Sequence, residues 1–167
     1  MNYLEKIAPS YIDLLGPLRR WKILDIEALK KASEYQGSAS GFYKIISKLE
    51  KVALIDSFIN SWSNQKFVYL LPDGVKALGE NRKGLYINRE TRYHDSLVSK
   101  VAQFFSSCPF TKQLHLDFEI EEKLPLLGRL PDILIEGLHN RPFKMAVEVE
   151  LTAKSGDRVR QMFKSYS

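Results

Sequence analysis

The chain has almost no cysteine, since Cys108 is the single one among 167 residues. One cysteine cannot form an intramolecular disulfide or a zinc site built from several thiolates. A chain without disulfides suits a reducing compartment, so we expect a cytoplasmic protein. No apolar run is long enough to cross a bilayer, and residues 1–10 lack the basic start and apolar core of a signal peptide. We therefore expect no membrane partner.

The sequence also has only a small excess of basic over acidic residues. Lysine and arginine number 25 against 20 acidic residues, which gives a net charge of +5 and a pI of about 9.2. Residues 1–85 hold 13 basic and 9 acidic side chains, so most of the excess lies in the first half. This distribution favours a polyanionic partner for that half. The length allows one medium domain or two small ones.

The clearest pattern in the sequence is an amphipathic helix over residues 41–52. Its apolar side chains recur at helical spacing and predict a buried stripe: Phe42, Ile45, Ile46, Leu49 and Val52. Two helices are predicted before it, at 11–20 with a break at Gly16-Pro17 and at 26–35 with Asp25 as N-cap. Strands are predicted after it at 54–60 and 66–71, around a polar tip, and a short helix at 75–80. Three helices, a hairpin and a helix are the order of a winged helix-turn-helix.

The phrase FYKIISKLEKVALIDSF…KFVYLLPDGVKAL resembles winged-helix regulators of the MarR-like kind. The resemblance implies that helix 41–52 enters the major groove of double-stranded DNA and that the hairpin follows the backbone or minor groove. The residues expected to face DNA are Tyr43, Lys44, Ser47, Lys48, Lys51, Trp62, Asn64, Gln65 and Lys66. Lysines on one helical face can neutralise phosphates, but they also suit a solvated face, and no arginine lies there to read guanine.

A second chemical pattern lies in residues 129–155. Strands are predicted at 131–136 and 144–151. Asp132 begins the first strand, and Glu148 and Glu150 share one face of the second because strand side chains alternate. If the strands pair, three carboxylates converge close to Lys154, as in sites that hold Mg²⁺ and activate a water. The alternative is that the glutamates form the solvated face of a half-buried sheet.

The order PD, fifteen residues, E-x-E resembles the PD-(D/E)xK nuclease superfamily. The resemblance implies that Asp132, Glu148 and Glu150 bind Mg²⁺ or Mn²⁺, that Lys154 is the catalytic cation beside them, and that no small-molecule cofactor takes part. Glu150 stands where the motif has lysine. A helix at 89–107, a strand at 114–123 and a helix at 156–167 complete most of an αβββα core, which lacks the strand that normally follows.

The segments RYHDSLVSKVAQFF, LPDILIEG and AVEVELTAKS, after a winged helix, resemble the replication-relaxation family of mobile elements. His94 and Asp95 match that family's helix motif without an assigned role. We expect an α+β protein with a winged helix-turn-helix domain over residues 1–85 and a restriction-endonuclease-like domain, incomplete at its end, over 86–167. An open sheet edge is a pairing hazard, so we expect a homodimer.

Three functions follow from these patterns. The first is a DNA-binding protein of plasmid or mobile-element replication, relaxation or mobilisation, with a metal-dependent nuclease or nicking site. The second is a catalytically inactive DNA-binding accessory protein or transcriptional regulator that uses the nuclease-like domain for dimerisation. The third makes both halves protein-interaction modules without a DNA role.

Overall fold

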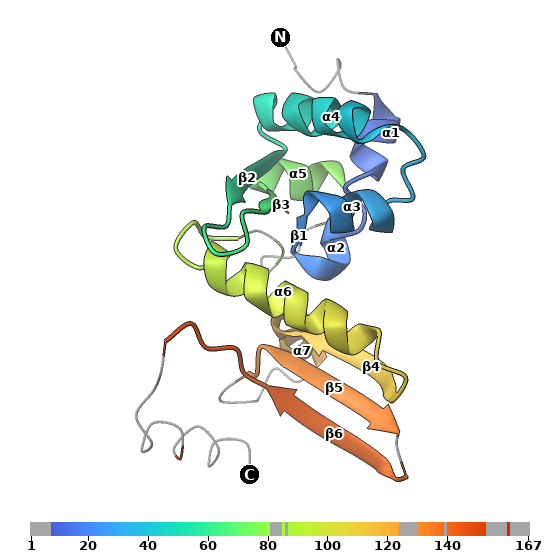
Figure 1. The fold of residues 1–167 in the computed structure, drawn as a ribbon, viewed down its shortest axis with the longest axis vertical. Helices are drawn as coiled ribbons and strands as arrows, with labels where there is room; N and C mark the ends of the chain where they lie inside the picture. Colours follow the sequence, from blue (N-terminus) through green and yellow to red (C-terminus); the bar gives the residue numbers. More distant parts are fainter. Residues whose placement is uncertain are drawn as a thin grey trace. The chain divides into compact units, whose positions relative to one another are not determined.

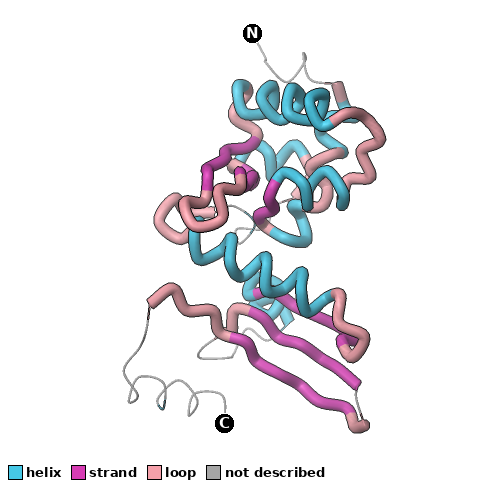
Figure 2. The backbone as a smooth tube through the Cα atoms, viewed as in Figure 1, coloured by secondary structure: helices cyan, strands magenta, loops and turns pink. Residues whose placement is uncertain are grey.

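A computed structural model describes residues 8–80, 85, 87–123, 130–138, 140–152 and 160. The chain splits into two compact units, Met1–Ser99 and Lys100–Ser167. Each unit contains one three-stranded sheet (Figures 1 and 2). Within the described ranges no helix is both long enough and apolar enough to cross a membrane. The elements are α1 (Pro9–Asp13), α2 (Leu18–Trp21), β1 (Ile23–Asp25), α3 (Ile26–Ala32), α4 (Ala39–Lys51), β2 (Ile55–Ile59), β3 (Lys66–Leu70), α5 (Pro72–Ala77), α6 (Arg92–Ser106), β4 (Thr111–Leu116), α7 (Asp117–Lys123), β5 (Ile133–Leu138) and β6 (Pro142–Val147).

The first unit has the element order and strand pairing of a winged helix-turn-helix. Helices α3 and α4 form the helix-turn-helix, and β2 and β3 form the hairpin. The sheet order is β1-β3-β2, with both pairs antiparallel. Strand β1 was not predicted, because its three residues are all buried and show no alternation. The predicted winged-helix order is therefore confirmed, with one short strand added.

Local sequence signals set the helix ends in this unit. The side chain of Asp25 accepts hydrogen bonds from the backbone N–H groups of Glu27 and Ala28 and caps α3. Ser38 caps α4 in the same way through the N–H of Gly41. The first predicted helix is split at Gly16-Pro17, as expected, into α1 and α2. Capping side chains satisfy N–H groups that a helix leaves unpaired, so these ends are stable.

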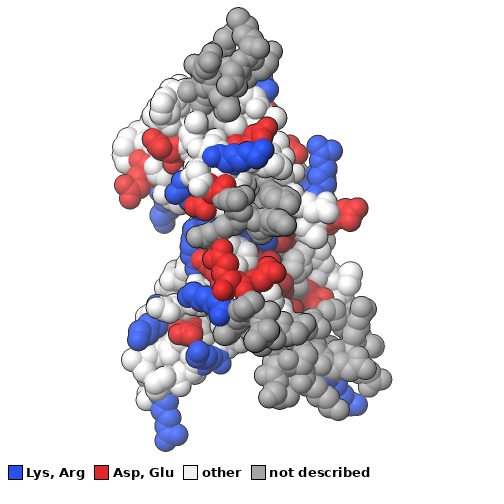
Figure 3. All heavy atoms as spheres, turned by 180° about the vertical axis from the view of Figure 1, so that it is seen from behind, with Lys and Arg blue, Asp and Glu red and all other residues white. Residues whose placement is uncertain are grey.

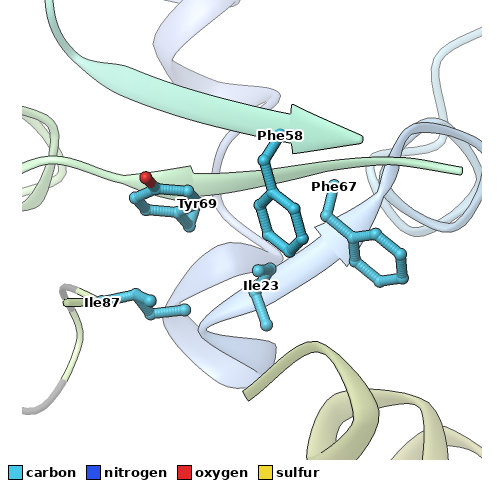
Figure 4. Close-up of a cluster of buried hydrophobic side chains, with 5 residues drawn as sticks. All are labelled: Ile23, Phe58, Phe67, Tyr69 and Ile87. Atoms are coloured by element: carbon cyan, nitrogen blue, oxygen red, sulfur yellow. The ribbon is translucent and has the colours of Figure 1, made fainter. Parts of the chain in front are cut away.

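One face of the hairpin closes over a cluster of aromatic and aliphatic side chains (Figure 4). Ile23, Phe58, Phe67, Tyr69 and Ile87 are all buried. The Phe58 and Phe67 rings are stacked with their centroids 5.8 Å apart. Tyr69 donates a 2.9 Å hydrogen bond from its hydroxyl to the Asp56 carboxylate. Large buried aromatic rings with a satisfied polar end fix the hairpin against β1.

The division between the two units falls within α6. Its first turns belong to the winged-helix unit, since Ser99 Oγ donates a 2.6 Å hydrogen bond to the Ile23 carbonyl. The Tyr93 ring packs edge-on against Phe58 at 5.0 Å. The sequence placed the boundary at 85/86, in the polar link before this helix. The first turns of the helix join the first unit because Tyr93 and Ser99 contact the hairpin and β1.

The second unit is an antiparallel sheet in the order β4-β5-β6 with α7 packed on it. The predicted strand over 114–123 is wrong beyond Leu116, where α7 begins. Glu119 Oε2 accepts a 2.9 Å hydrogen bond from the Leu116 N–H, which is half of a capping box. The predicted buried face is nevertheless correct: Leu114, Leu116, Phe118 and Ile120 are all buried.

The predicted strand over 144–151 is also too long, because β6 ends at Val147. Val147 pairs with Ile133, the first residue of β5, so the pairing of these two strands ends there. Instead, the Val149 N–H donates a 2.7 Å hydrogen bond to Asp132 Oδ2. The predicted helix over 156–167 lies outside the described residues, apart from Arg160. The nuclease-like architecture is not confirmed and stays a prediction.

Candidate nucleic-acid interface

Helix α4 has one buried apolar face and one exposed polar face. Phe42, Ile45, Ile46 and Leu49 are buried, so the helix cannot rotate without exposing them. The predicted DNA-facing side chains of this helix are all exposed: Tyr43, Lys44, Ser47, Lys48 and Lys51. Of these, Lys48 also lies over the Tyr11 ring, with Nζ 5.4 Å from the ring centre. The face can therefore meet a polyanion with several ammonium groups from one rigid helix.

The tip of the hairpin is a turn organised by Asn60, whose side chain is buried. Its Oδ1 accepts hydrogen bonds from the N–H groups of Trp62 (2.9 Å) and Ser63 (3.3 Å). Its backbone N–H and carbonyl bond to Gln65 and Asn64, and Asn64 adopts a left-handed φ of 53°. Trp62 and Asn64 are exposed, and Gln65 is half-buried. Asn60 was not predicted as a residue of this site, although asparagine before a polar tip is a recognised turn former.

Lys66 holds the hairpin against α4. Its Nζ lies 2.7 Å from Glu50 Oε1, and both side chains are mostly buried. The same carboxylate accepts a hydrogen bond from the Ser57 hydroxyl of β2. Lys66 was predicted to contact DNA, but in the structure its ammonium group forms an ion pair with Glu50. The ion pair fixes the hairpin in position relative to the exposed face of α4.

Charged side chains of both signs are exposed on the face of the protein drawn in Figure 3. On the face in Figure 3, lysine and arginine are interspersed with aspartate and glutamate. A net charge of only +5 gives weak long-range steering. The exposed lysines of α4 are a local feature suited to a polyanion.

The three carboxylates predicted to bind metal do not form a metal-binding group. Among the described residues, no group of three His, Cys, Asp or Glu side chains is placed so that it could hold a metal ion. Asp132 is engaged with the Val149 N–H, and Glu148 and Glu150 lie beyond the end of β6 rather than along it. Lys154 lies outside the described residues. Binding of Mg²⁺ or Mn²⁺ and metal-dependent cleavage therefore stay predictions from the sequence.

His94 and Asp95 form part of a polar network at the start of α6. Asp95 Oδ2 accepts a 2.8 Å hydrogen bond from the Thr91 hydroxyl, and Lys22 Nζ lies 3.9 Å from Oδ1. Burial alone raises the pKa of Asp95, but the hydrogen bond with His94, the charge of Lys22 and the Thr91 hydroxyl outweigh it. The pKa of this carboxyl therefore lies below its usual value of 3.8. This network ties α6 to the turn before β1.

The Asp95→Asn variant is expected to be less stable than the wild type at pH 7 by about 2 kcal/mol, since charge-assisted hydrogen bonds are lost. A depressed pKa stabilises the fold above the unfolded-state pKa, and this stability is lost as the pH falls through the lower folded-state value. The difference between the two proteins should therefore shrink as the pH falls from about 5 to below the usual aspartate pKa. Urea unfolding over a pH series measures it.

The control for this prediction is Asp73→Asn, which removes the exposed ion pair between Asp73 and Lys76 at 3.2 Å. Exposed pairs contribute little, so we expect a change within about 0.5 kcal/mol. A difference between wild type and Asp95→Asn that stays constant from pH 7 to pH 3 would contradict the role of the Asp95 charge.

No protein-family model matches the chain, and no curated protein matches it. Two solved structures are similar to it. The PcaV transcriptional regulator from Streptomyces coelicolor is 19% identical, with 62% of this chain and 74% of that chain covered and a TM-score of 0.38. MepR of S. aureus, in a complex with DNA, is 16% identical, with 63% and 85% covered and a TM-score of 0.38. With scores this low, the winged-helix assignment rests on the element order and strand pairing of this chain.

Proposed function

We propose that this protein binds double-stranded DNA through α4 and acts as a regulator or DNA-binding accessory protein. The observation that carries the proposal is the face of α4, where Lys44, Lys48 and Lys51 are exposed on a helix fixed by a buried stripe. The helix follows α3 in a helix-turn-helix, the arrangement that places its second helix in the major groove. Lysines on such a helix contact phosphates and release counterions.

The same face limits how the protein reads sequence. No arginine lies on it to form the paired hydrogen bonds that recognise guanine. Ser40, Tyr43 and Ser47 are uncharged polar side chains exposed there, and a hydroxyl group contacts bases with little discrimination. We therefore expect phosphate contacts to supply most of the affinity, with modest preference among sequences.

The proposal has two finer parts. The first is a homodimer, which light scattering would contradict by showing a monomer at working concentration. The second is a role in replication or mobilisation of a mobile element, which rests on the family resemblance of the sequence. Neither part is needed for DNA binding through α4.

The Lys44→Ala variant is expected to bind every duplex more weakly and to reduce the slope of log affinity against log salt by about 1, because one phosphate contact is lost. Fluorescence anisotropy of a labelled duplex over a salt series measures both quantities. Lys112→Ala is the matched control, since Lys112 is an exposed lysine on β4 in the other unit. Equal salt slopes for the two variants would contradict binding through α4.

A further inference from the structure

The hairpin tip carries no charge with which to bind phosphates. Residues 60–65 contain no lysine, arginine, aspartate or glutamate. The next residue, Lys66, is paired with Glu50 at 2.7 Å. Neutralising phosphates requires available cations. If this hairpin takes part in DNA binding, its tip does so through uncharged contacts.

The end of the hairpin exposes large apolar side chains instead. Trp62 is 71% exposed and Ile59 is 61% exposed, one at the tip and the other at the end of β2. Tryptophan is usually well buried, so a mostly exposed tryptophan is an informative feature of this tip. The end of the hairpin therefore offers an aromatic and an aliphatic side chain to a partner.

The tip is also held in one conformation. The Trp62 N–H is bonded to the buried Asn60 side chain, whose Nδ2 lies 3.4 Å from Ser96 Oγ in the same unit. The strands below the tip are fixed to α4 through Glu50, which contacts both Lys66 and Ser57. A rigid support lowers the entropy cost of binding at the exposed ring. The position of Trp62 relative to a ligand bound on α4 is therefore fixed by these contacts.

We infer that the exposed ring of Trp62 is an apolar wedge that stacks on a nucleobase at an unstacked step or an unpaired position in the DNA. This inference rests on the proposed function and specifies how the hairpin contributes to it. Proteins insert apolar side chains between bases of the minor groove, and aromatic rings stack on unpaired bases irrespective of sequence. An uncharged tip with an exposed indole is suited to this contact.

The test compares wild type, Trp62→Ala and Trp62→Phe on an intact duplex and on the same duplex with one unpaired base. We expect Trp62→Ala to lose roughly 10-fold in affinity, with the larger loss on the duplex with the unpaired base. The salt slope should stay unchanged, because no cation is removed, and Trp62→Phe should recover most of the affinity. Since Trp62 is exposed, these variants should keep the wild-type circular dichroism spectrum.

A direct readout uses the Trp21→Phe background, in which Trp62 is the one remaining tryptophan. Stacking on a base should quench its fluorescence when DNA is added. Unchanged affinity in Trp62→Ala and unchanged Trp62 emission, while Lys44→Ala still weakens binding, would overturn the wedge and leave the proposed function standing. Absence of duplex binding by the wild type at low salt would overturn both. Loss of self-association in Trp62→Ala, without loss of DNA affinity, would assign the tip to a second copy of the chain and overturn the wedge.

Discussion

Replacing Phe42 by alanine is expected to lower the free energy of unfolding of the winged-helix unit by about 4 kcal/mol. Phe42 is fully buried, and its ring lies 5.1 Å from that of Tyr35 at the end of the turn after α3. Truncation removes the buried ring and leaves a cavity between the two helices of the helix-turn-helix. Urea unfolding followed by tryptophan fluorescence measures the loss, because Trp21 and Trp62 both lie in this unit.

The matched control is the next residue along the helix. Tyr43 is 47% exposed, so Tyr43→Ala is expected to change stability by no more than about 0.5 kcal/mol. The same variant removes a side chain from the proposed DNA face, so it should affect DNA binding more than folding. Similar losses of stability in the two variants would contradict the assigned faces of α4, and with them the proposed interface.

The faces of α4 could be predicted because a regular pattern in the sequence matches a regular element. Its apolar residues repeat every three to four positions over a helix of 13 residues, which is long enough to fix the inward direction. The strands of the hairpin were predicted for a similar reason, since β-branched and aromatic residues surround a polar tip. The Asp25 cap precedes an apolar residue, which is a local signal of a helix start.

The candidate metal site depends on a predicted strand over 144–151 that is longer than β6. Alternation continues through Glu148 and Glu150, but a strand continues only where a neighbour offers backbone partners. That neighbour, β5, starts at Ile133, and Asp132 takes the Val149 N–H with its side chain. Alternation over 114–123 was misleading in the same way, because Phe118 and Ile120 are buried from a helix rather than from a strand. Burial could be predicted there, and backbone pairing could not.

Replacing Gly74 by alanine is expected to destabilise the same unit by about 3 kcal/mol. Gly74 lies in α5 at an ordinary helical φ, where alanine is intrinsically favoured by about 1 kcal/mol. A Cβ atom built there lies 1.9 Å from the Leu54 carbonyl oxygen and 2.9 Å from its carbon. Both are backbone atoms, and that oxygen accepts the Leu71 N–H at 3.0 Å. The chain must shift at the start of β2, and the hydrogen bond is strained or lost.

Gly79→Ala separates this effect from backbone conformation. Gly79 has a φ of 73°, which costs an L-residue about 1 kcal/mol, but no atom lies within 4 Å of a Cβ built there. If backbone conformation alone determined stability, Gly79→Ala would be the less stable variant. If the close approach of α5 to Leu54 dominates, Gly74→Ala is the less stable variant. Urea unfolding of both variants decides between the rankings. A Gly74→Ala protein as stable as the wild type would show that α5 does not press against Leu54, and that the base of the hairpin is held less rigidly than the wedge requires.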